Sequence, residues 1–432
     1  MRRKPIFFKH KGIVMCLFML LFVSYTSFSQ VESTQSKFDY EAELNRSVPI
    51  PNSPEAEAFT QYGNTPVNMY AGSPNMGIPI YTHQGRELNL PVSLSYDASG
   101  IKVEQLATSV GLGWNLAVGG RISRIANGNP DDYIQSGITP YVSFWNDDVR
   151  DNMLAYRDES TRFTSRDSVV LYFDFLNRVS INENDTQPDY FSLNAIGIND
   201  YIAFDVSTRQ AYALNNPNII VEFVTTPAAQ NGMRSITQWT VTGADGTKYY
   251  FEEAEITNYQ GDDSNQNFAV TKIYNSSWVL TKIESANRRD TYTFNYTLLA
   301  PWSQNFSVSG YSSYTYTIDQ NTPSYVSAPV YVTSSVPSIR IEQQRLDSII
   351  HNGKEIVSIT YENRYDTGAS GAIDEIVIKD GSTQEHKTYD LLTSYFGMNS
   401  NENPSTQQPF DIRLKLDGID ITSNTGDLYQ KY

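Results

Sequence analysis

Short apolar or aromatic runs alternate with clusters of Gly, Asn, Asp, Ser and Pro along most of the chain after its first fifty residues. Residues 88–96 alternate apolar and polar positions with a period of two, which is typical of a strand with one buried face. Residues 209–214 and 219–224 are further strand-like runs. Residues 238–251 hold two such runs around an Asp-Gly pair at 245–246, and this dipeptide favours a β-hairpin turn.

Helical patterns are scarce by comparison. Almost no segment keeps apolar residues at the spacing of an α-helix, and the best candidate, around residues 54–62, is barely two turns long. Closely spaced strands separated by turn residues predict an all-β fold, made of many short antiparallel strands and hairpins.

A weak internal repeat supports this prediction. Leu280, Leu346 and Leu416 each begin a unit that consists of a strand, a polar turn and a second strand. Because one hairpin cannot bury its own apolar face, such units are expected to stack on their neighbours. The third unit stops at Tyr432, where its second strand should begin, so we expect the chain to end inside a domain with an exposed sheet edge.

The N-terminal residues differ from the rest. Residues 1–29 combine five basic residues, an apolar run over residues 13–23 and small residues at 27 and 29, which is the pattern of a secretory signal peptide. The apolar run is too short to span a bilayer, which needs about 20 residues. We therefore expect a secreted or outer-surface protein, with cleavage after Ser29 and a polar, mobile leader over residues 30–50.

Composition narrows the function classes further. The 432 residues carry a formal net charge of −16, and removal of the signal would lower it to −21. This acidity disfavours nucleic-acid binding, which needs clustered Lys and Arg. Cys16, the only cysteine, lies inside the signal and lacks the neighbours of a lipoprotein site, so the mature chain should contain neither disulfides nor cysteine-bound metal.

Residues 51–130 contain the most specific motif of the chain. It reads SYDASGIKV over residues 95–103 and VGLGWNLAVGGRISR over residues 110–124. Its structural motif residues are Gly100, Gly111, Gly113, Trp114, Gly119, Gly120 and Arg124. Looser matches follow at residues 187–192, 245–251 and 277–283. Together these segments resemble the N-terminal region of secreted bacterial RHS/YD-repeat proteins and, more distantly, insecticidal toxin-complex shell proteins.

The resemblance implies a strand-rich wall of a β-shell or a stacked β-sandwich. It divides the chain into an RHS-type region over residues 51–300 and further hairpin repeats, apparently truncated, over residues 301–432. The partners that it implies are a downstream RHS/YD-repeat segment or a C-terminal cargo. Two departures stand out: Ser109 replaces a Trp that many relatives carry, and tandem YD repeats are absent, with only a fragment at Tyr365-Asp366.

Several residues suggest chemistry, but each has a simpler interpretation. The glycines of the motif lack the spacing and the βαβ context of a dinucleotide loop, so tight bends beside a buried Trp114 are expected, and Trp114→Ala should cost about 3–5 kcal/mol. Asp131-Asp132 and Asp262-Asp263 lack regular calcium-ligand spacing and are expected in solvated loops. The histidines of the mature chain lie far apart in sequence, which favours surface or turn positions: His83, His351 and His386.

The tryptophans at positions 114, 145, 239 and 278 could form a sugar-binding platform, but such residues more often anchor a β core. The sequence therefore predicts a secreted, non-catalytic β-shell segment without a catalytic residue, cofactor or metal, which acts by enclosure or surface interaction. An adhesin that binds carbohydrate, such as cell-surface glycans, or another surface is the alternative, and exposed aromatic rows would favour it. A glycoside hydrolase would need two carboxylates about 5–10 Å apart across a cleft.

Overall fold

The computed structural model describes residues 75–101, 105–132, 134–136, 142–181, 183–229, 232–263, 268–305, 313–315, 328–330, 338–367, 371–379, 385–398, 402–406, 411–423 and 428–431. The chain divides into two compact units, Met1–Thr65 and Pro66–Tyr432, and all described residues belong to the second. The predicted signal peptide, the leader and the 54–62 helix lie outside the described residues.

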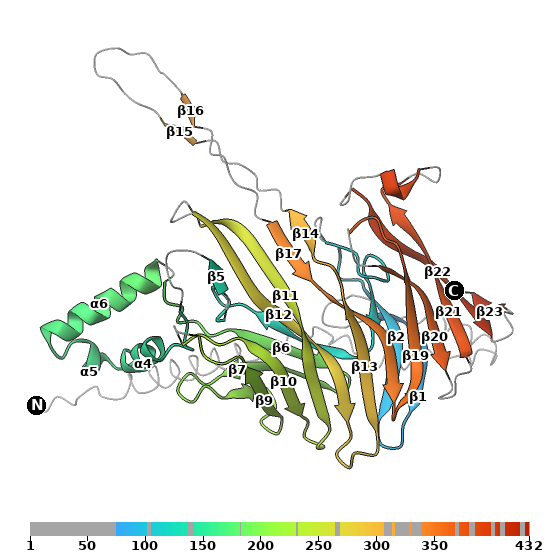
Figure 1. The fold of residues 1–432 in the computed structure, drawn as a ribbon, viewed down its shortest axis with the longest axis horizontal. Coiled ribbons are helices and arrows are strands. Elements are labelled where there is room, and N and C mark those ends of the chain that lie inside the picture. The colour runs from blue at the N-terminus through green and yellow to red at the C-terminus, as the bar shows by residue number, and fades with distance from the viewer. Residues whose placement is uncertain are drawn as a thin grey trace, which may run out of the picture. The chain divides into compact units, whose positions relative to one another are not determined.

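Strands dominate this unit: the described structure is 54 % strand and 11 % helix, which confirms the predicted all-β class (Figure 1). A small antiparallel sheet contains β1 (Asn75–Gln84), β2 (Asn89–Asp97) and β3 (Trp114–Ala117), in that order. In β2, the alternating residues Leu90, Val92 and Leu94 are buried, as their period-two pattern predicts.

Most other strands form one continuous antiparallel network, and β15 (Ser313–Thr315) pairs separately with β16 (Ala328–Val330). The first strands of the network are β4 (Gly120–Ile125), β5 (Ile134–Ser136), β6 (Tyr190–Ala195), β7 (Ile198–Phe204), β8 (Ala211–Ala213), β9 (Ile220–Thr225) and β10 (Ile236–Thr242). Next are β11 (Lys248–Asp263), β12 (Phe268–Glu284), β13 (Thr291–Leu298), β14 (Trp302–Asn305), β17 (Ser338–Glu342) and β18 (Gln344–His351). The last are β19 (Lys354–Glu362), β20 (Ala372–Lys379), β21 (Glu385–Phe396), β22 (Arg413–Ser423) and β23 (Leu428–Lys431), with a 3₁₀ turn at Pro404–Thr406.

The long hairpin β11–β12 joins two groups of strands (Figure 1). At the end of the hairpin that lies far from its turn, β11 pairs with β10 and β12 pairs with β13. Strand β13 pairs in turn with β18, and the strand order continues from β18 to β23. Nearer the β11–β12 turn, β11 pairs with β17, while β12 pairs with β4 and β5. Register shifts between Tyr250 and Ile256 lie where the partners change, as expected for bulges that bend a strand.

The hairpins predicted from sequence are present. Strands β10 and β11 pair around Asp245-Gly246, with Trp239 opposite Phe251. The three repeat units are the antiparallel pairs β12–β13, β18–β19 and β22–β23. The predicted runs at 209–214 and 219–224 contain β8 and β9. Local alternation and turn chemistry therefore identify these pairs without knowledge of their neighbours.

A helical insertion between β5 and β6 was not predicted (Figure 1). It contains α4 (Asp147–Ala155), α5 (Glu159–Arg162) and α6 (Arg166–Ser180). Helix α6 is rich in Val, Phe and Tyr, which favour strands, but a capping box between Ser165 and Ser168 fixes its first turn. None of the helices in the described ranges is long and apolar enough to cross a membrane.

An aromatic core fills the region where the strand groups meet. Trp239 and Trp278 are completely buried, and their ring centroids are 5.7 Å apart in an edge-to-face arrangement. Phe191 of β6 contacts both rings. These side chains come from β6, β10 and β12, so the core binds strands that are distant in sequence.

Candidate functional site

The motif residues lie in the small sheet and in β4, and the 107–113 loop connects two of these strands. Leu112 donates its backbone N–H to the carbonyl of Leu414 on β22, at 2.8 Å. Gly111 has a φ of +142°, and an added Cβ would stand 2.8 Å from the backbone nitrogen of Leu416. Only glycine fits this close approach, so the Val-Gly-Leu-Gly run attaches the loop to β22.

A buried ion pair completes this attachment. Arg364 donates to Asp366 at 2.6 Å and to the backbone carbonyls of Ala107 and Thr108 at 2.8 and 2.9 Å. Asp366 also accepts the N–H of Leu414 at 2.9 Å. Both charged side chains are at most 2 % exposed. The Tyr365-Asp366 fragment therefore includes a carboxylate that accepts the N–H of Leu414 and holds Arg364, which in turn binds residues 107 and 108; its sequence did not reveal this.

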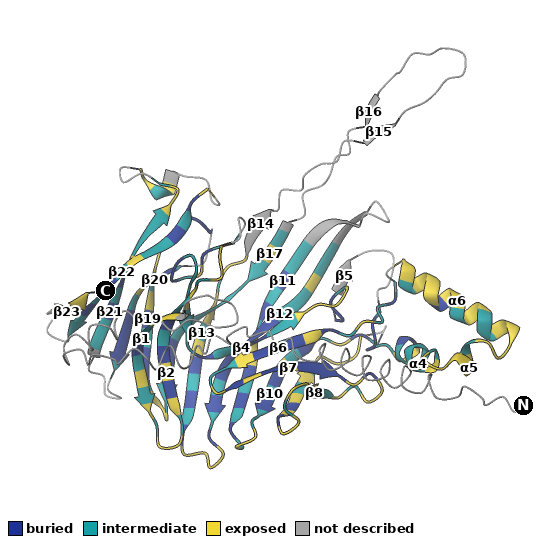
Figure 2. Cartoon of the chain, turned by 180° about the vertical axis from the view of Figure 1, so that it is seen from behind, coloured by how far each residue is buried: buried dark blue, intermediate teal, exposed yellow. Residues whose placement is uncertain are grey.

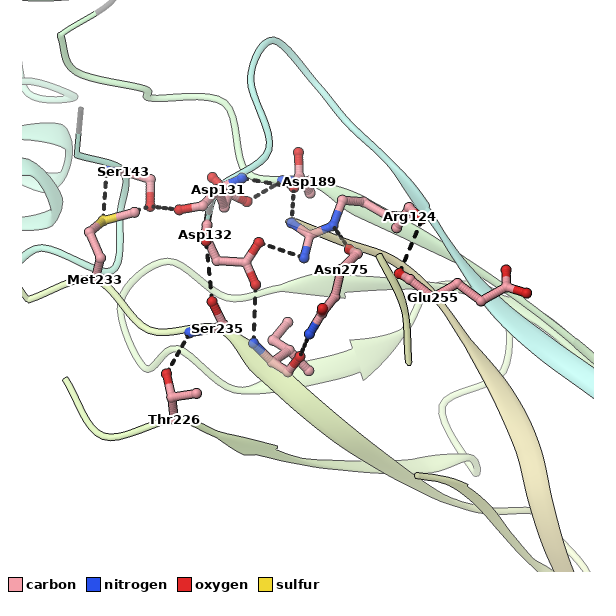
Figure 3. Close-up of polar contacts among 12 residues, drawn as sticks. Arg124, Asp131, Asp132, Ser143, Asp189, Thr226, Met233, Ser235, Glu255 and Asn275 are labelled. Carbon is pink, nitrogen blue, oxygen red and sulfur yellow. Dashed lines mark hydrogen bonds and ion pairs between the residues drawn. The ribbon is translucent and has the colours of Figure 1, made fainter. Parts of the chain in front are cut away.

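The second buried site is the Arg124 cluster, formed by Arg124, Asp131, Asp132 and Asp189 (Figure 3). Arg124, near the end of β4, lies 2.6 Å from Asp189 and 2.7 Å from Asp132, and donates to the carbonyl of Asn275 at 2.9 Å. The guanidinium also lies against the rings of Phe191 and Trp278, at 5.2 and 5.6 Å.

The carboxylates of this cluster hold backbone groups in place. Asp189 accepts the N–H groups of Asn127 and Asp131, both at 3.0 Å. Asp131 accepts the N–H of Asp189 at 2.6 Å, and Asp132 accepts that of Ile236 at 3.1 Å. The cluster thus ties β4, β6, β10 and β12 together at one point. The side chains of its ion pairs are at most 1 % exposed, so they cannot reach an external substrate.

Burial sets the protonation of these groups. It raises the pKa of Asp131 well above its ordinary value, and the nearby Asp189 adds to the rise. It also raises the pKa of Asp132, although Arg124 opposes this effect. Burial alone would lower the pKa of Arg124, but Asp132 and Asp189 outweigh it and raise that pKa. The guanidinium therefore stays charged, and Asp131 is the acid best placed to hold a proton.

The expected solvated position of Asp131-Asp132 is wrong, because both residues are only 3 % exposed. Asp262-Asp263 was also expected in a loop, but its backbone belongs to the end of β11. Within the described ranges, no group of three or more His, Cys, Asp or Glu side chains is arranged to hold a metal ion. In the Arg124 cluster, the cation among the carboxylates is the guanidinium itself.

A comparison with protein-family models finds no match to this chain, and neither does a comparison with curated proteins. The site must therefore be interpreted from its own geometry.

The remaining motif residues occupy bends of the same region. Gly100 follows β2, Gly113 precedes β3, and Gly119 lies between β3 and β4. Gly120 packs against Ala195, which an added Cβ would approach to 2.3 Å. Trp114 is only partly buried, and its ring lies 5.1 Å from that of Tyr96 in a tilted arrangement, so we now expect its removal to cost less than that of a fully buried tryptophan. The fully enclosed tryptophans are instead Trp239 and Trp278.

Two histidines that are distant in sequence lie side by side, contrary to the expected surface or turn positions. The ring centroids of His83 on β1 and His351 on β18 are 4.4 Å apart. His83 Nδ1 lies 2.9 Å from the hydroxyl of Tyr292, and His351 Nε2 lies 3.0 Å from Asp290. We call these four residues the His83 cluster. The third histidine, His386, belongs to β21.

The His83 cluster holds the β1–β2 turn against β13. Asp290 accepts the N–H groups of Glu87 and Leu88, at 2.5 and 2.9 Å, and the Tyr292 hydroxyl donates to the Leu88 carbonyl at 2.9 Å. Because that hydroxyl has one proton, it accepts the Nδ1–H of His83. No pattern in the sequence could have found this cluster, since His83 lies 209 residues before Tyr292, and Asp290 lies 61 residues before His351.

This arrangement predicts a pH-dependent contribution to stability. Burial lowers the pKa of His83 below its ordinary value of 6.5, and the neighbouring His351 lowers it further, against an opposing effect of Asp290. The unfolded chain therefore binds more protons at His83 than the folded protein, and this contribution is present above about pH 6.5 and lost as the pH falls.

The test is a comparison of melting temperatures between pH 7.5 and pH 5 for the wild-type protein and His83→Asn, whose amide can replace the Nδ1–H. We expect the melting temperature of the wild-type protein to fall more than that of the variant between pH 7.5 and pH 5. The raised pKa values of Asp131 and Asp132 act with the opposite sign, and their effect cancels in the difference. Parallel pH profiles for the two proteins would contradict the assignment.

Proposed function

We propose that this chain is a non-catalytic β-wall segment of an RHS/YD-repeat system, which encloses a cargo or presents a surface. One observation carries the proposal: Arg124 and Asp189, two charged residues of the matching segments, bind each other and the backbone in a sealed cluster. Arg124 and Asp189 belong to two separate matching segments, and the 107–113 loop is held by Arg364 and Asp366. Such residues build a wall and leave no reactive group facing solvent at these points.

The buried tryptophans support the same function. Trp145, Trp239 and Trp278 are 4 % exposed or less, so they serve the core and cannot form a sugar platform. A glycoside hydrolase needs carboxylates that reach a substrate. Asp131 and Asp189, whose carboxylates act on each other, are at most 3 % exposed and belong to the Arg124 cluster. The geometry thus favours architecture over hydrolysis.

The proposal is tested by co-expression of the full-length protein with the polypeptide encoded directly downstream of its gene. We expect a stable complex in size-exclusion chromatography with light scattering, in which the downstream polypeptide resists protease. The control is the downstream polypeptide expressed without this chain, which should be digested rapidly. If no complex forms, and the downstream polypeptide is digested at the same rate with and without this chain, the wall function is refuted.

A further inference from the structure

The face of β4, β6, β7 and β8 that points away from the aromatic core carries a row of exposed apolar side chains. Side chains alternate between the two faces of a strand, so Arg124 and Phe191 point to the core while their neighbours Ile125 and Tyr190 point outward. On β7, Tyr201 points outward between the buried Asp200 and Ile202.

The strand register places these outward residues together. Ile125 is opposite Tyr190, Ser192 is opposite Tyr201, and Ala203 is opposite Tyr212. Leu214 donates its N–H to the carbonyl of Tyr201, at 2.8 Å, and therefore lies beside Tyr201. We call this surface the tyrosine face, which consists of Ile125, Tyr190, Tyr201, Tyr212 and Leu214. Their exposed fractions are 44, 43, 46, 46 and 46 %, respectively.

A small residue separates two of the rings. Phe191 pairs with Ile202, which places Tyr190 next to Ala203, and Ala203 in turn pairs with Tyr212. Ala203 lies two residues from Tyr201 on β7 and so points to the same face, but it is only 4 % exposed. Neighbouring strands are about 4.8 Å apart, so Tyr190 and Tyr212 are separated by roughly 10 Å across this alanine. Figure 2 shows exposed segments on these strands beside the buried core.

The polar residues paired across β4, β6 and β7 on this surface are uncharged, and one exposed acid, Asp205, lies two residues beyond Ala203. Ser123 and Ser192 are paired across β4 and β6, and Asn194 and Asn199 across β6 and β7. Arg121 lies at the far end and pairs with Glu255 at 3.1 Å. A group of exposed tyrosines between hydroxyl and amide groups matches a sugar chain, because apolar sugar faces stack on aromatic rings and sugar hydroxyls bond to Ser, Asn and Tyr.

We propose that the tyrosine face binds a neutral glycan. The exposed Asp205 beside the rings and the net charge of −16 disfavour an anionic ligand. The Arg124 cluster lies directly behind this face and fixes β4 and β6, so the rings are held on a rigid support before any ligand arrives. The proposal does not rest on the wall function and stands or falls separately.

The test is a glycan array that displays neutral, sialylated and sulfated oligosaccharides, probed with the labelled full-length protein. We expect binding to neutral glycans. The combined variant Tyr190→Ala/Tyr201→Ala/Tyr212→Ala should bind at least roughly tenfold more weakly, because it loses all three ring contacts. The corresponding triple Phe variant should keep most of the binding because it retains the rings.

Tyr365→Ala is the matched control, because Tyr365 is 38 % exposed but lies in the loop between β19 and β20. It should bind as the wild-type protein does. Each variant is first compared with the wild-type protein by thermal unfolding, so that loss of the fold is recognised. Failure to bind any glycan, binding to charged glycans alone, or equal binding by the folded triple Ala variant would overturn the proposal. Capture of a protein partner by the same face, without glycan binding, would also overturn it.

Discussion

Replacement of Arg124 by methionine should cost about 3–5 kcal/mol of unfolding free energy, because it leaves buried carboxylates without their counter-charge. Arg124 lies 2.6 Å from Asp189 and 2.7 Å from Asp132, and all three side chains are at most 1 % exposed. Methionine retains much of the side-chain length and packing, so the loss reports mainly on charge. Urea unfolding at pH 7.5 measures it as a lower midpoint with an unchanged slope.

The exposed ion pair on α6 supplies the control. Arg178 and Asp174 are 54 and 57 % exposed and 3.2 Å apart, so Arg178→Met should change stability by less than about 1 kcal/mol. Arg124→Lys keeps the charge but loses the two-pronged donor geometry. Its loss of unfolding free energy should therefore lie between those of Arg124→Met and Arg178→Met. Equal unfolding midpoints for Arg124→Met and Arg178→Met would show that the Arg124 cluster does not stabilise the fold.

Truncation of Trp278 to alanine should be similarly severe, at about 3–5 kcal/mol. The indole is completely buried and touches Phe191 and Trp239, with ring centroids 5.8 and 5.7 Å away. Its loss opens a cavity between strands that the remaining rings cannot fill. Thermal and urea unfolding of Trp278→Ala measure the cost.

Trp114→Ala provides the comparison within the same protein. Its indole is half-buried and rests on Tyr96, so removal should cost about 1–2 kcal/mol, on the scale of one partly buried apolar side chain. The ratio between the losses of unfolding free energy in Trp278→Ala and Trp114→Ala distinguishes a core residue from one at the edge of the core. An equal or larger loss for Trp114→Ala would contradict the burial difference.

Local features of this fold follow from its sequence, and long-range features do not. The alternation of Leu90, Val92 and Leu94 predicts the buried face of β2, because that pattern depends only on the strand period. The Asp245-Gly246 turn predicts a hairpin for the same local reason. Helix α6 was not predicted because its apolar residues favour strands. In addition, the capping box of Ser165 is formed with a serine instead of Glu or Gln.

The candidate sites required the third dimension. Arg124 was recognisable as part of a motif, but its partners come from three other segments, and Asp131-Asp132 resembles a solvated acidic pair in sequence. His83 and His351 are joined only by the folding of β1 against β18. The exposed tyrosines could not be grouped from the sequence for another reason. Only the register of β6, β7 and β8 brings Tyr190, Tyr201 and Tyr212 to one face.

The attachment of the 107–113 loop to β22 also affects the order in which the chain can fold. Leu112 has its partner in Leu414, which a ribosome adds roughly 15–60 s later at about 5–20 residues per second. The β1–β2 turn must likewise await Asp290 and Tyr292. These long-range contacts cannot form until residues 290 and 414 have been synthesised, so the β1–β2 turn and the 107–113 loop stay without these partners, and accessible to chaperones, until then.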